Sequence, residues 1–310
     1  MRAPALPESC SRPTALFRGE FFAIDDWRCA GEDTPGRRQE WAPDDCVVVT
    51  RRGAWELESE GETRLADPLT ATLWNRGAYR VRHPVSGGDA CTIFRLTASG
   101  RRAVRDLSGG RARRSPRSTF ATRFRPLDGR SYLLHRQALA NARLPHGAPD
   151  PLAVEEPALA FLRLVSAGAS RPSELPCARE ASRYVERARD LIARDFRQPL
   201  TLGGIAREVH CSPFHLSRLF RHATGLTLHR TVVRLRLREG LERLLDQPGE
   251  VSTIALALGF ASHSHFADAF RAEFGCSPSE ARRTLAPRAA RLLVQSSHDL
   301  PSSSRPGRSR

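Results

Sequence analysis

The sequence contains no lysine, a single methionine and few aromatic residues, which make up 7% of its 310 positions. All 49 basic residues are therefore arginine, and the net charge is +15. A GC-rich coding sequence accounts for an all-arginine basic set, so the choice of arginine is not by itself a functional signal. The position of the charge along the chain is more informative.

Long apolar runs and cysteine pairs are also absent. The most apolar stretch, "PALAFLRLVSAGA", is interrupted by Arg163, which excludes a membrane-spanning helix there. The first residues, "MRAPALPESCSRPT", have no apolar block of the secretory type, so we expect a cytoplasmic protein that does not enter a membrane. The 7 cysteines never form a C-x-x-C pair, which predicts buried free thiols and no disulfide framework.

The positive charge is concentrated in the second part of the chain. Residues 99–130 contain 10 arginines against 2 acidic residues, and residues 178–285 contain 17 against 12. Residues 1–98 are slightly acidic, with 13 arginines against 15 acidic residues. Solvated surface charge could explain any one segment, but the asymmetry indicates that the second half binds a polyanion.

Residues 1–98 are predicted to form a β-rich domain. Short apolar or alternating runs recur at the spacing of strands, separated by glycine, proline, asparagine and aspartate, which is typical of an all-β barrel or sandwich. The predicted strands are Val47–Thr50, Ala54–Leu57, Leu69–Trp74, Tyr79–Val81 and Cys91–Leu96. The arginine-rich residues 99–130 are predicted to be a mobile loop or an insertion.

Helical periodicity begins after this segment. Residues 131–168 contain two amphipathic stretches, 131–144 and 155–167, and residues 169–180 are predicted to be a linker. Residues 181–285 are almost entirely helical in pattern. The basic tail 286–310 is rich in serine and proline, and we expect it to be disordered.

The helical region contains an internal repeat of about 50 residues. The segment "TLGGIAREVHCSPFHLSRLFRHATG" is followed by "VSTIALALGFASHSHFADAFRAEFG", in which the isoleucine-alanine, phenylalanine-arginine and final glycine positions correspond. His210 and Gly259 occupy the break between two helices, where a positive φ is needed. Ser212 and Ser262 are predicted to cap the helices that follow. The repeat predicts two helix-turn-helix units, 201–222 and 251–272, joined by a helix.

The motifs "ARDLIARDFRQPLTLGGIAREVHCSPFHLSRLFRHATG", "VVRLRLREGLERLL" and "VSTIALALGFASHSHFADAFRAEFGCSPSEAR" resemble the DNA-binding domain of AraC/XylS transcription regulators. The resemblance covers residues 181–285. It implies seven helices, two of which enter successive major-groove segments. The predicted fold class is thus α+β with two domains: a β-rich, cupin-like jelly roll or barrel, and an all-α domain of two helix-turn-helix units joined by a helix.

The resemblance also implies which side chains contact DNA. Seven residues of the two recognition helices are placed at bases and three arginines at phosphates. The predicted base contacts are Phe214, Ser217, Arg218, His263, Ser264, Ala267 and Asp268, and the predicted phosphate contacts are Arg221, Arg236 and Arg271. Arg218 has the clearest chemistry, because a guanidinium group can bond guanine O6 and N7 together. A solvated helix face remains the alternative for each arginine.

Three positions depart from the family pattern. Asp268 stands where some relatives have a base-reading arginine, so it is predicted either to accept from a cytosine amine or to hold Arg271. Gly240 lies in the middle of a predicted helix where alanine is common, and Thr231 replaces an aromatic residue. Glycine at such a position weakens a helix by about 1 kcal/mol.

The two neighbouring histidines of the second unit are not predicted to bind a metal. His263 and His265 are two residues apart, so on a helix they point in different directions. We expect His263 to face DNA and His265 to pack beside Phe266 or face a phosphate.

The β-rich region resembles the cupin-like effector domains of the same family in its position ahead of the DNA-binding domain. Trp41, Trp55, Trp74, Tyr79 and His83 are candidate effector-lining residues, although aromatic residues in a β domain are more often part of the core. The paired histidines of a metal-binding cupin are missing, so no metal and no cofactor are predicted. His83 and Cys91 flank a turn, as a structural hairpin or as a sensor pair.

The sequence therefore predicts a transcription regulator that binds double-stranded promoter DNA, contacts RNA polymerase and responds to an unknown small-molecule effector. Activation and repression are both open. A homodimer could form through the stripe Leu159, Leu162 and Val165, or that stripe could pack on the β domain. The chain is not predicted to be an enzyme; the alternatives are a cupin-type or cysteine-acceptor enzyme fused to a helix-turn-helix domain, and a nucleoid protein without sequence preference.

Overall fold

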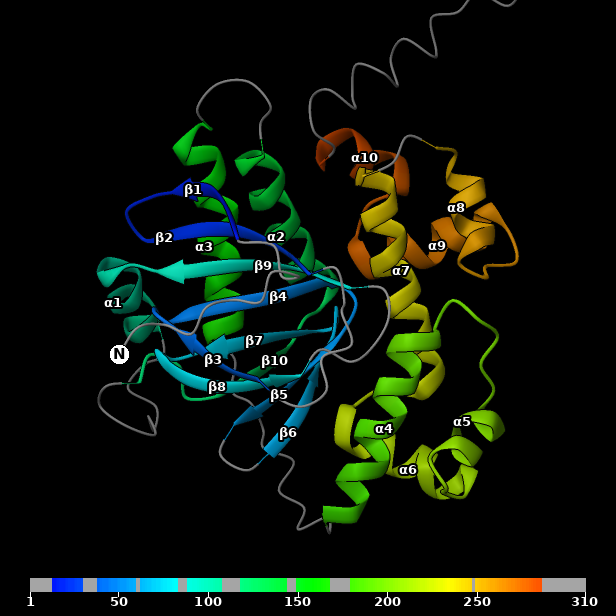
Figure 1. Ribbon diagram of the computed structural model, residues 1–310. Helices are drawn as coiled ribbons and strands as arrows, with labels where there is room; N and C mark the ends of the chain where they lie inside the picture. The colour runs from blue at the N-terminus through cyan, green and yellow to red at the C-terminus, as the bar shows by residue number, and fades with distance from the viewer. Residues whose placement is uncertain are drawn as a thin grey trace, which may run out of the picture.

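The structure is a computed structural model. It describes residues 13–29, 38–59, 62–82, 88–107, 118–143, 149–167, 179–246 and 249–285. The chain folds into a β-rich N-terminal part with three covering helices and a helical C-terminal part (Figure 1). This arrangement confirms the predicted α+β class.

Two antiparallel sheets form the N-terminal part. The larger sheet has the strand order β1-β2-β9-β4-β7-β10, and the smaller has the order β3-β8-β5-β6. The larger sheet contains β1 (Thr14–Arg18), β2 (Phe22–Cys29), β9 (Asp89–Leu96), β4 (Cys46–Arg52), β7 (Thr70–Trp74) and β10 (Phe124–Pro126). The smaller contains β3 (Arg38–Ala42), β8 (Gly77–Arg82), β5 (Trp55–Ser59) and β6 (Glu62–Ala66).

Alternation along the central strand β4 explains why the larger sheet is buried on both faces. Val47 and Val49 point into the core shared with the helices, whereas Cys46 and Val48 point into the core between the sheets. Successive side chains of a strand face opposite sides, so this apolar run serves two cores. The five strands predicted from the sequence are confirmed as β4, β5, β7, β8 and β9.

Helices α1 (Ala98–Leu107), α2 (Gly129–Ala142) and α3 (Pro151–Ala167) cover the other face of the larger sheet. The prediction of a loop over 99–130 is wrong for much of its length, because α1 is a helix and β10 pairs with β7. Val104 anchors α1 in the core while Arg102 faces outward, so the arginine-rich composition concealed an amphipathic helix. Residues 108–117 lie outside the described part.

The apolar stripe of α3 packs within the N-terminal part. Leu162 and Val165 are both 3% exposed and belong to the core beneath the sheet, and Leu159 packs against the same core. Of the two interpretations of this stripe, packing on the β domain is confirmed, which leaves the stripe unavailable as a dimer surface.

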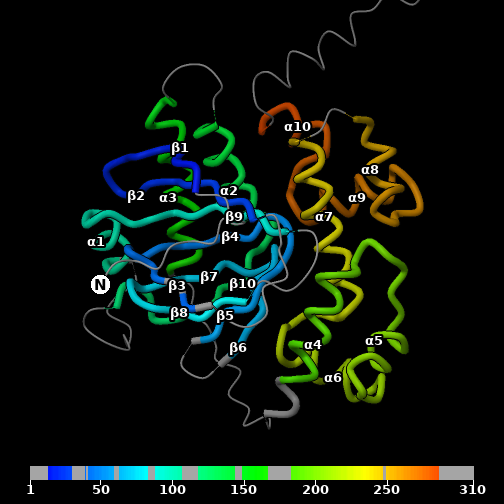
Figure 2. The backbone as a smooth tube through the Cα atoms, viewed as in Figure 1, coloured from blue at the N-terminus to red at the C-terminus, as the bar shows by residue number. Residues whose placement is uncertain are grey.

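The C-terminal part contains seven helices among its described residues, as the family resemblance implies. They are α4 (Arg179–Asp195), α5 (Leu202–Glu208), α6 (Pro213–Thr224), α7 (Leu228–Asp246), α8 (Val251–Ala257), α9 (His263–Phe274) and α10 (Pro278–Leu285). Helix α7 stands between the sheets and the helices α5 and α8 (Figures 1 and 2). In the described part of the chain, no helix is long and apolar enough to cross a membrane.

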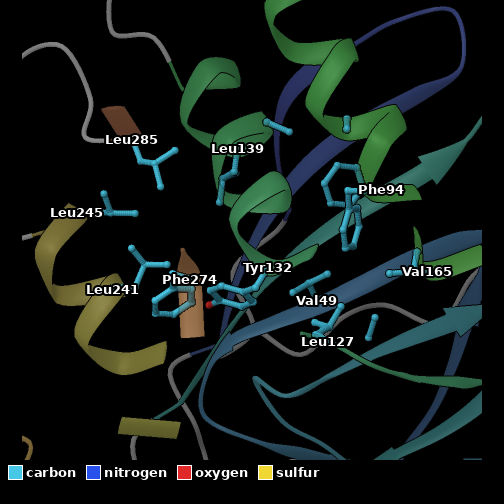
Figure 3. Packing of buried hydrophobic residues seen from close by; sticks show 14 of the residues in the cluster. Val49, Phe94, Leu127, Tyr132, Leu139, Val165, Leu241, Leu245, Phe274 and Leu285 are labelled. Atoms are coloured by element: carbon cyan, nitrogen blue, oxygen red, sulfur yellow. The ribbon is translucent and has the colours of Figure 1, made fainter. Parts of the chain in front are cut away.

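The single helix α7 contributes to both hydrophobic cores of the C-terminal part. Its first half supplies Val232 and Leu235 to the core of the first unit, and its second half supplies Leu241 and Leu245 to the core of the second. The core of the second unit continues into the N-terminal part, where Leu241 lies near Tyr132 of α2 (Figure 3). One continuous helix therefore links the two units.

Candidate nucleic-acid interface

Each helix-turn-helix unit turns at a residue with a positive φ. The turn residue is His210 in the first unit, with φ of 58°, and Gly259 in the second, with φ of 75°. His210 is the one non-glycine residue with a positive φ in the described ranges. An L-residue is strained in this conformation and histidine tolerates it better than most, so both turn predictions are confirmed.

The helix after each turn is delimited by the same pair of caps. The side chain of Ser212 accepts from the backbone N–H of His215 at 3.3 Å, and that of Ser262 accepts from the N–H of His265 at 3.1 Å. At the other end, Gly225 and Gly275 adopt left-handed conformations that close the helices. These caps confirm the predicted starts of α6 and α9.

Helix α6 presents a buried face and a polar, exposed face. Leu216 and Phe220 are fully buried. On the opposite side Arg218 and Arg221 are exposed, Ser217 is half-buried, and Phe214 is 90% exposed. The Phe214 ring and the Arg218 side chain, four residues apart, lie on this exposed face.

Helix α9 repeats this arrangement. Phe266 and Phe270 form its buried face, and Ala267 is half-buried. The exposed residues are those predicted to approach DNA: His263, Ser264, Asp268 and Arg271. Because the buried faces of α6 and α9 are equivalent, the two exposed faces are equivalent as well.

His265 is exposed, and the edge of its ring contacts Phe260 with 5.4 Å between the centroids. It therefore packs at the base of the helix beside Phe260, while its neighbour Phe266 enters the core. Among the described residues, no group of three or more histidine, cysteine or acidic side chains is placed to hold a metal ion.

Comparison with known proteins supports this geometry. Residues 205–284 match a family model described as a helix-turn-helix domain. The HTH-type transcriptional regulator GlxA of Rhizobium meliloti (strain 1021) is 38% identical over 86 residues, which are 28% of this chain and 26% of the relative. Residues 205–284 therefore match a helix-turn-helix family, and we call residues 179–285 the AraC-type domain after the regulators that their motifs resemble.

Two further relatives are similar over a limited length. The bifunctional transcriptional activator/DNA repair enzyme AdaA of Bacillus subtilis (strain 168) is 28% identical over 102 residues, 33% of this chain and 48% of AdaA. A crystal structure of an AraC-type regulator from Chromobacterium violaceum is 29% identical, with a TM-score of 0.33, over 34% of this chain and 96% of that one. The chain thus spans between about a quarter and about a half of the two curated relatives.

Arg236 of the AraC-type domain differs from its predicted role. Its guanidinium group donates to three backbone carbonyls, those of Phe196 at 2.8 Å, Gln198 at 3.1 Å and Gly259 at 3.1 Å. With these donors engaged, the side chain ties the segment after α4 to the turn of the second unit. These bonds favour a structural role for Arg236, and its phosphate contact stays a prediction.

Two departures from the family pattern have a packing explanation. A Cβ at Gly240 would lie 2.9 Å from the ring of Phe266 and 3.2 Å from a methyl group of Leu258. The missing side chain lets α9 approach α7 closely. Thr231 is buried, and its hydroxyl donates to the carbonyl of Thr227 at 3.0 Å, which satisfies its polar atom inside the helix.

The candidate effector residues are mostly core. Trp55, Trp74 and Tyr79 are at most 7% exposed and pack together between the sheets. Each indole N–H donates to a neighbouring hydroxyl, Trp55 to Thr50 at 3.0 Å and Trp74 to Thr72 at 2.9 Å. These internal bonds favour the core interpretation. Trp41 is 51% exposed, and His83 lies outside the described residues.

Cys91 is buried, and its thiol donates to Asp89 at 3.4 Å. Burial, followed by the charge of Asp89, raises its pKa well above the ordinary value, so the group is a neutral thiol at pH 7. Burial likewise raises the pKa of the Cys46 thiol. Neutral buried thiols are poor nucleophiles, which argues against cysteine-acceptor chemistry at either position.

A buried ionic cluster joins the N-terminal part to the AraC-type domain. Glu242 of α7 is fully buried; it accepts from the Tyr132 hydroxyl at 2.9 Å and lies 3.1 Å from Arg136 Nε, both on α2. Arg51 of β4 approaches it at 4.0 Å and also pairs with Asp26 of β2. Tyr132, Arg136 and Arg51 all belong to the N-terminal part.

The second recognition helix is held at the same boundary. Arg234 and Arg238 of α7 both donate to the carbonyl of Leu127 and both pair with Glu273 of α9. A Cβ on Gly129 would lie 1.6 Å from the Glu273 carbonyl oxygen, so only glycine allows α2 to start this close to α9. The first unit is attached separately.

That second attachment is made by α4. Arg189 donates to Asp67 at 2.8 Å and to the Leu65 carbonyl at 3.2 Å, while Glu186 accepts from the Leu65 N–H at 3.0 Å. Asp67 lies between β6 of the smaller sheet and β7 of the larger sheet. The N-terminal part thus contacts both helix-turn-helix halves of the AraC-type domain.

The sequence carries one signal for this boundary. Arg238 and Glu242 are four residues apart on α7, beside the apolar positions Leu237 and Leu241. Charges within an apolar stripe are seldom buried unless they are paired. Their partners, however, are far away in the sequence and could not be identified from it.

Proposed function

We propose that this protein is a sequence-specific DNA-binding transcription regulator whose N-terminal part controls the AraC-type domain. The observation that supports this most directly is the duplication of an exposed, capped recognition helix on one continuous helix, α7. Two such helices can enter successive major-groove segments on one face of a duplex. The GlxA and AdaA relatives are both named as transcriptional proteins.

The proposed base contacts are the exposed or half-buried residues of the two helices. They are Phe214, Ser217, Arg218, His263, Ser264, Ala267 and Asp268. Arg221 and Arg271 are proposed to bind phosphate, which adds affinity without sequence information. The ring of Phe214 is suited to an apolar contact with a thymine methyl group.

The expected partners besides DNA are RNA polymerase, a small-molecule effector and a second copy of the chain. A cytoplasmic regulator of this kind would contact RNA polymerase at a promoter and respond to a small-molecule effector through its N-terminal part. Two helix-turn-helix units allow binding as a monomer, and a homodimer would need a surface other than the buried stripe of α3. The name of AdaA includes a DNA repair enzyme, but the buried neutral thiols of Cys46 and Cys91 do not favour that activity here.

Competition binding tests the proposal. The full chain is incubated with a labelled random duplex pool, bound sequences are selected, and the affinity for the selected duplex is compared with that for random duplex as salt is raised. A specific regulator keeps a preferred sequence at each salt concentration. Equal loss of affinity for all duplexes would instead identify a nucleoid-type protein.

A further inference from the structure

The two recognition helices carry opposite charges at one equivalent position. Arg218 follows its cap, Ser212, by six residues, and Asp268 follows its cap, Ser262, by six residues. Both side chains are exposed. Because the caps and the buried faces of α6 and α9 correspond, Arg218 and Asp268 occupy the same place on their exposed faces.

The flanking positions show that the difference in charge is confined to the centre of the face. One helical turn later, Arg221 and Arg271 are both exposed arginines, so the proposed phosphate contact is kept in each unit. One turn earlier, Phe214 of the first unit corresponds to Ser264 of the second. Positions four residues apart lie on one face of a helix, so residues 214 and 218 form a pair, as do 264 and 268.

Asp268 is an exposed carboxylate near the middle of α9. Among the described residues, no hydrogen bond or ion pair joins it to a neighbour, which removes the alternative that it holds Arg271. The other carboxylate of α9, Glu273, is bound by Arg234 and Arg238. The two acidic residues of α9 therefore differ: one is neutralised at the domain boundary, and one projects unpaired from the recognition face.

An unpaired carboxylate on a DNA-facing surface is repelled by phosphate. A hydrogen bond donated by a base offsets this repulsion. In the major groove the amine that suits a carboxylate is N4 of cytosine. A guanidinium group in the equivalent place suits guanine O6 and N7, and a phenyl ring beside it suits a thymine methyl group. The two faces therefore call for different bases.

We infer that the two units read unlike half-sites: the first selects guanine through Arg218 beside a thymine at Phe214, and the second selects cytosine through Asp268. This inference rests on the proposed function, because it requires that α6 and α9 both enter the major groove.

The test is selection from a random duplex pool with the full chain and three variants, Asp268→Ala, Asp268→Asn and Arg218→Ala. We expect the unmodified chain to select two unequal half-sites about one helical turn apart. Asp268→Ala should lose the preference for cytosine at one position of one half-site. Asp268→Asn should change that preference to adenine, because an amide pairs with adenine N6 and N7.

Affinities for single-base variants of the selected site give the magnitude. For the unmodified chain, replacing the cytosine should lower affinity by about tenfold, and for Asp268→Ala the same replacement should have no effect. Arg218→Ala should act on a guanine of the other half-site and leave the cytosine preference intact. This variant is the matched control.

The outcomes separate the two proposals. If no variant and no condition yields an enriched sequence, the proposed function itself fails. If a sequence is enriched but Asp268→Ala leaves every base preference unchanged and raises affinity for all duplexes alike, Asp268 is merely a repelled surface charge and the inference is overturned. An enriched site with two identical half-sites would overturn it as well.

Discussion

Gly240 and His210 show how single residues set the geometry of the AraC-type domain. His210 accepts a positive φ so that the first unit can turn, and Gly240 omits a side chain so that Phe266 can pack on α7. The first feature could be predicted from the repeat, because a turn is a local requirement. The second could not, because the contact joins residues on different helices.

Gly240→Ala is expected to destabilise the protein even though alanine favours helices. Phe266 is fully buried between Phe260 and Phe270, so its ring has little room to move away from a new methyl group. Overpacking of this kind costs about 1–3 kcal/mol, which exceeds the gain of up to about 1 kcal/mol in helix propensity. Chemical denaturation of the full chain measures the difference.

The matched control is Gly203→Ala in α5, where a Cβ would meet nothing within 4 Å. This variant should be neutral or more stable by up to about 1 kcal/mol. If both substitutions stabilise the protein equally, the packing explanation of Gly240 is wrong.

At the scale of the element, the sequence predicted the helices, turns and caps of the second half well. Their signals, such as Ser212 before Pro213 or glycine at the end of a helix, lie within a few residues of the feature they determine. Whether a long charged side chain is bonded within the protein or exposed was less predictable. Arg236 and Arg221 look alike in the sequence, yet one is bonded to three carbonyls and the other is exposed.

These two arginines should therefore respond differently to removal. Arg221→Ala is expected to weaken binding to all duplexes alike and to reduce the slope of log affinity against log salt by about 1, because one phosphate contact is lost. Arg236→Ala should leave that slope unchanged and lower the free energy of unfolding by about 1–2 kcal/mol, because its hydrogen bonds hold the second turn. Binding titrations at several salt concentrations and denaturation curves measure both effects; a lower slope for Arg236→Ala would restore the phosphate interpretation.

Across the complete protein, the N-terminal part forms ionic contacts with the AraC-type domain at two places. One is the ionic cluster around Glu242, and the other is the contact of Arg189 with Asp67. Buried ion pairs specify one arrangement and are poor at stabilising it. The strands and helices predicted from the sequence gave no account of this boundary, since Arg51 and Glu242 are distant in the chain.

Glu242→Gln tests this boundary. The substitution keeps the volume but removes the counter-charge beside Arg136, whose side chain is 3% exposed, and leaves Arg51, which is 1% exposed, with Asp26 alone. We expect the free energy of unfolding to fall by about 3 kcal/mol, and amide hydrogen exchange to increase at the start of α2 and the end of α9. Asp268→Asn neutralises an exposed carboxylate on the same chain. We expect it to change the free energy of unfolding by no more than about 0.5 kcal/mol and to leave amide hydrogen exchange unchanged. An equal effect of the two substitutions would show that Glu242 is not a docking residue.

The central claim is that both recognition helices dock on one face of a duplex. Chemical footprinting of the full chain on its selected duplex tests this most directly, because it reports which bases and sugars each helix covers. We expect two protected major-groove patches centred about 10 base pairs apart, with one guanine of the first exposed in Arg218→Ala and the second altered in Asp268→Asn. A single protected patch that no substitution in α9 affects would contradict it.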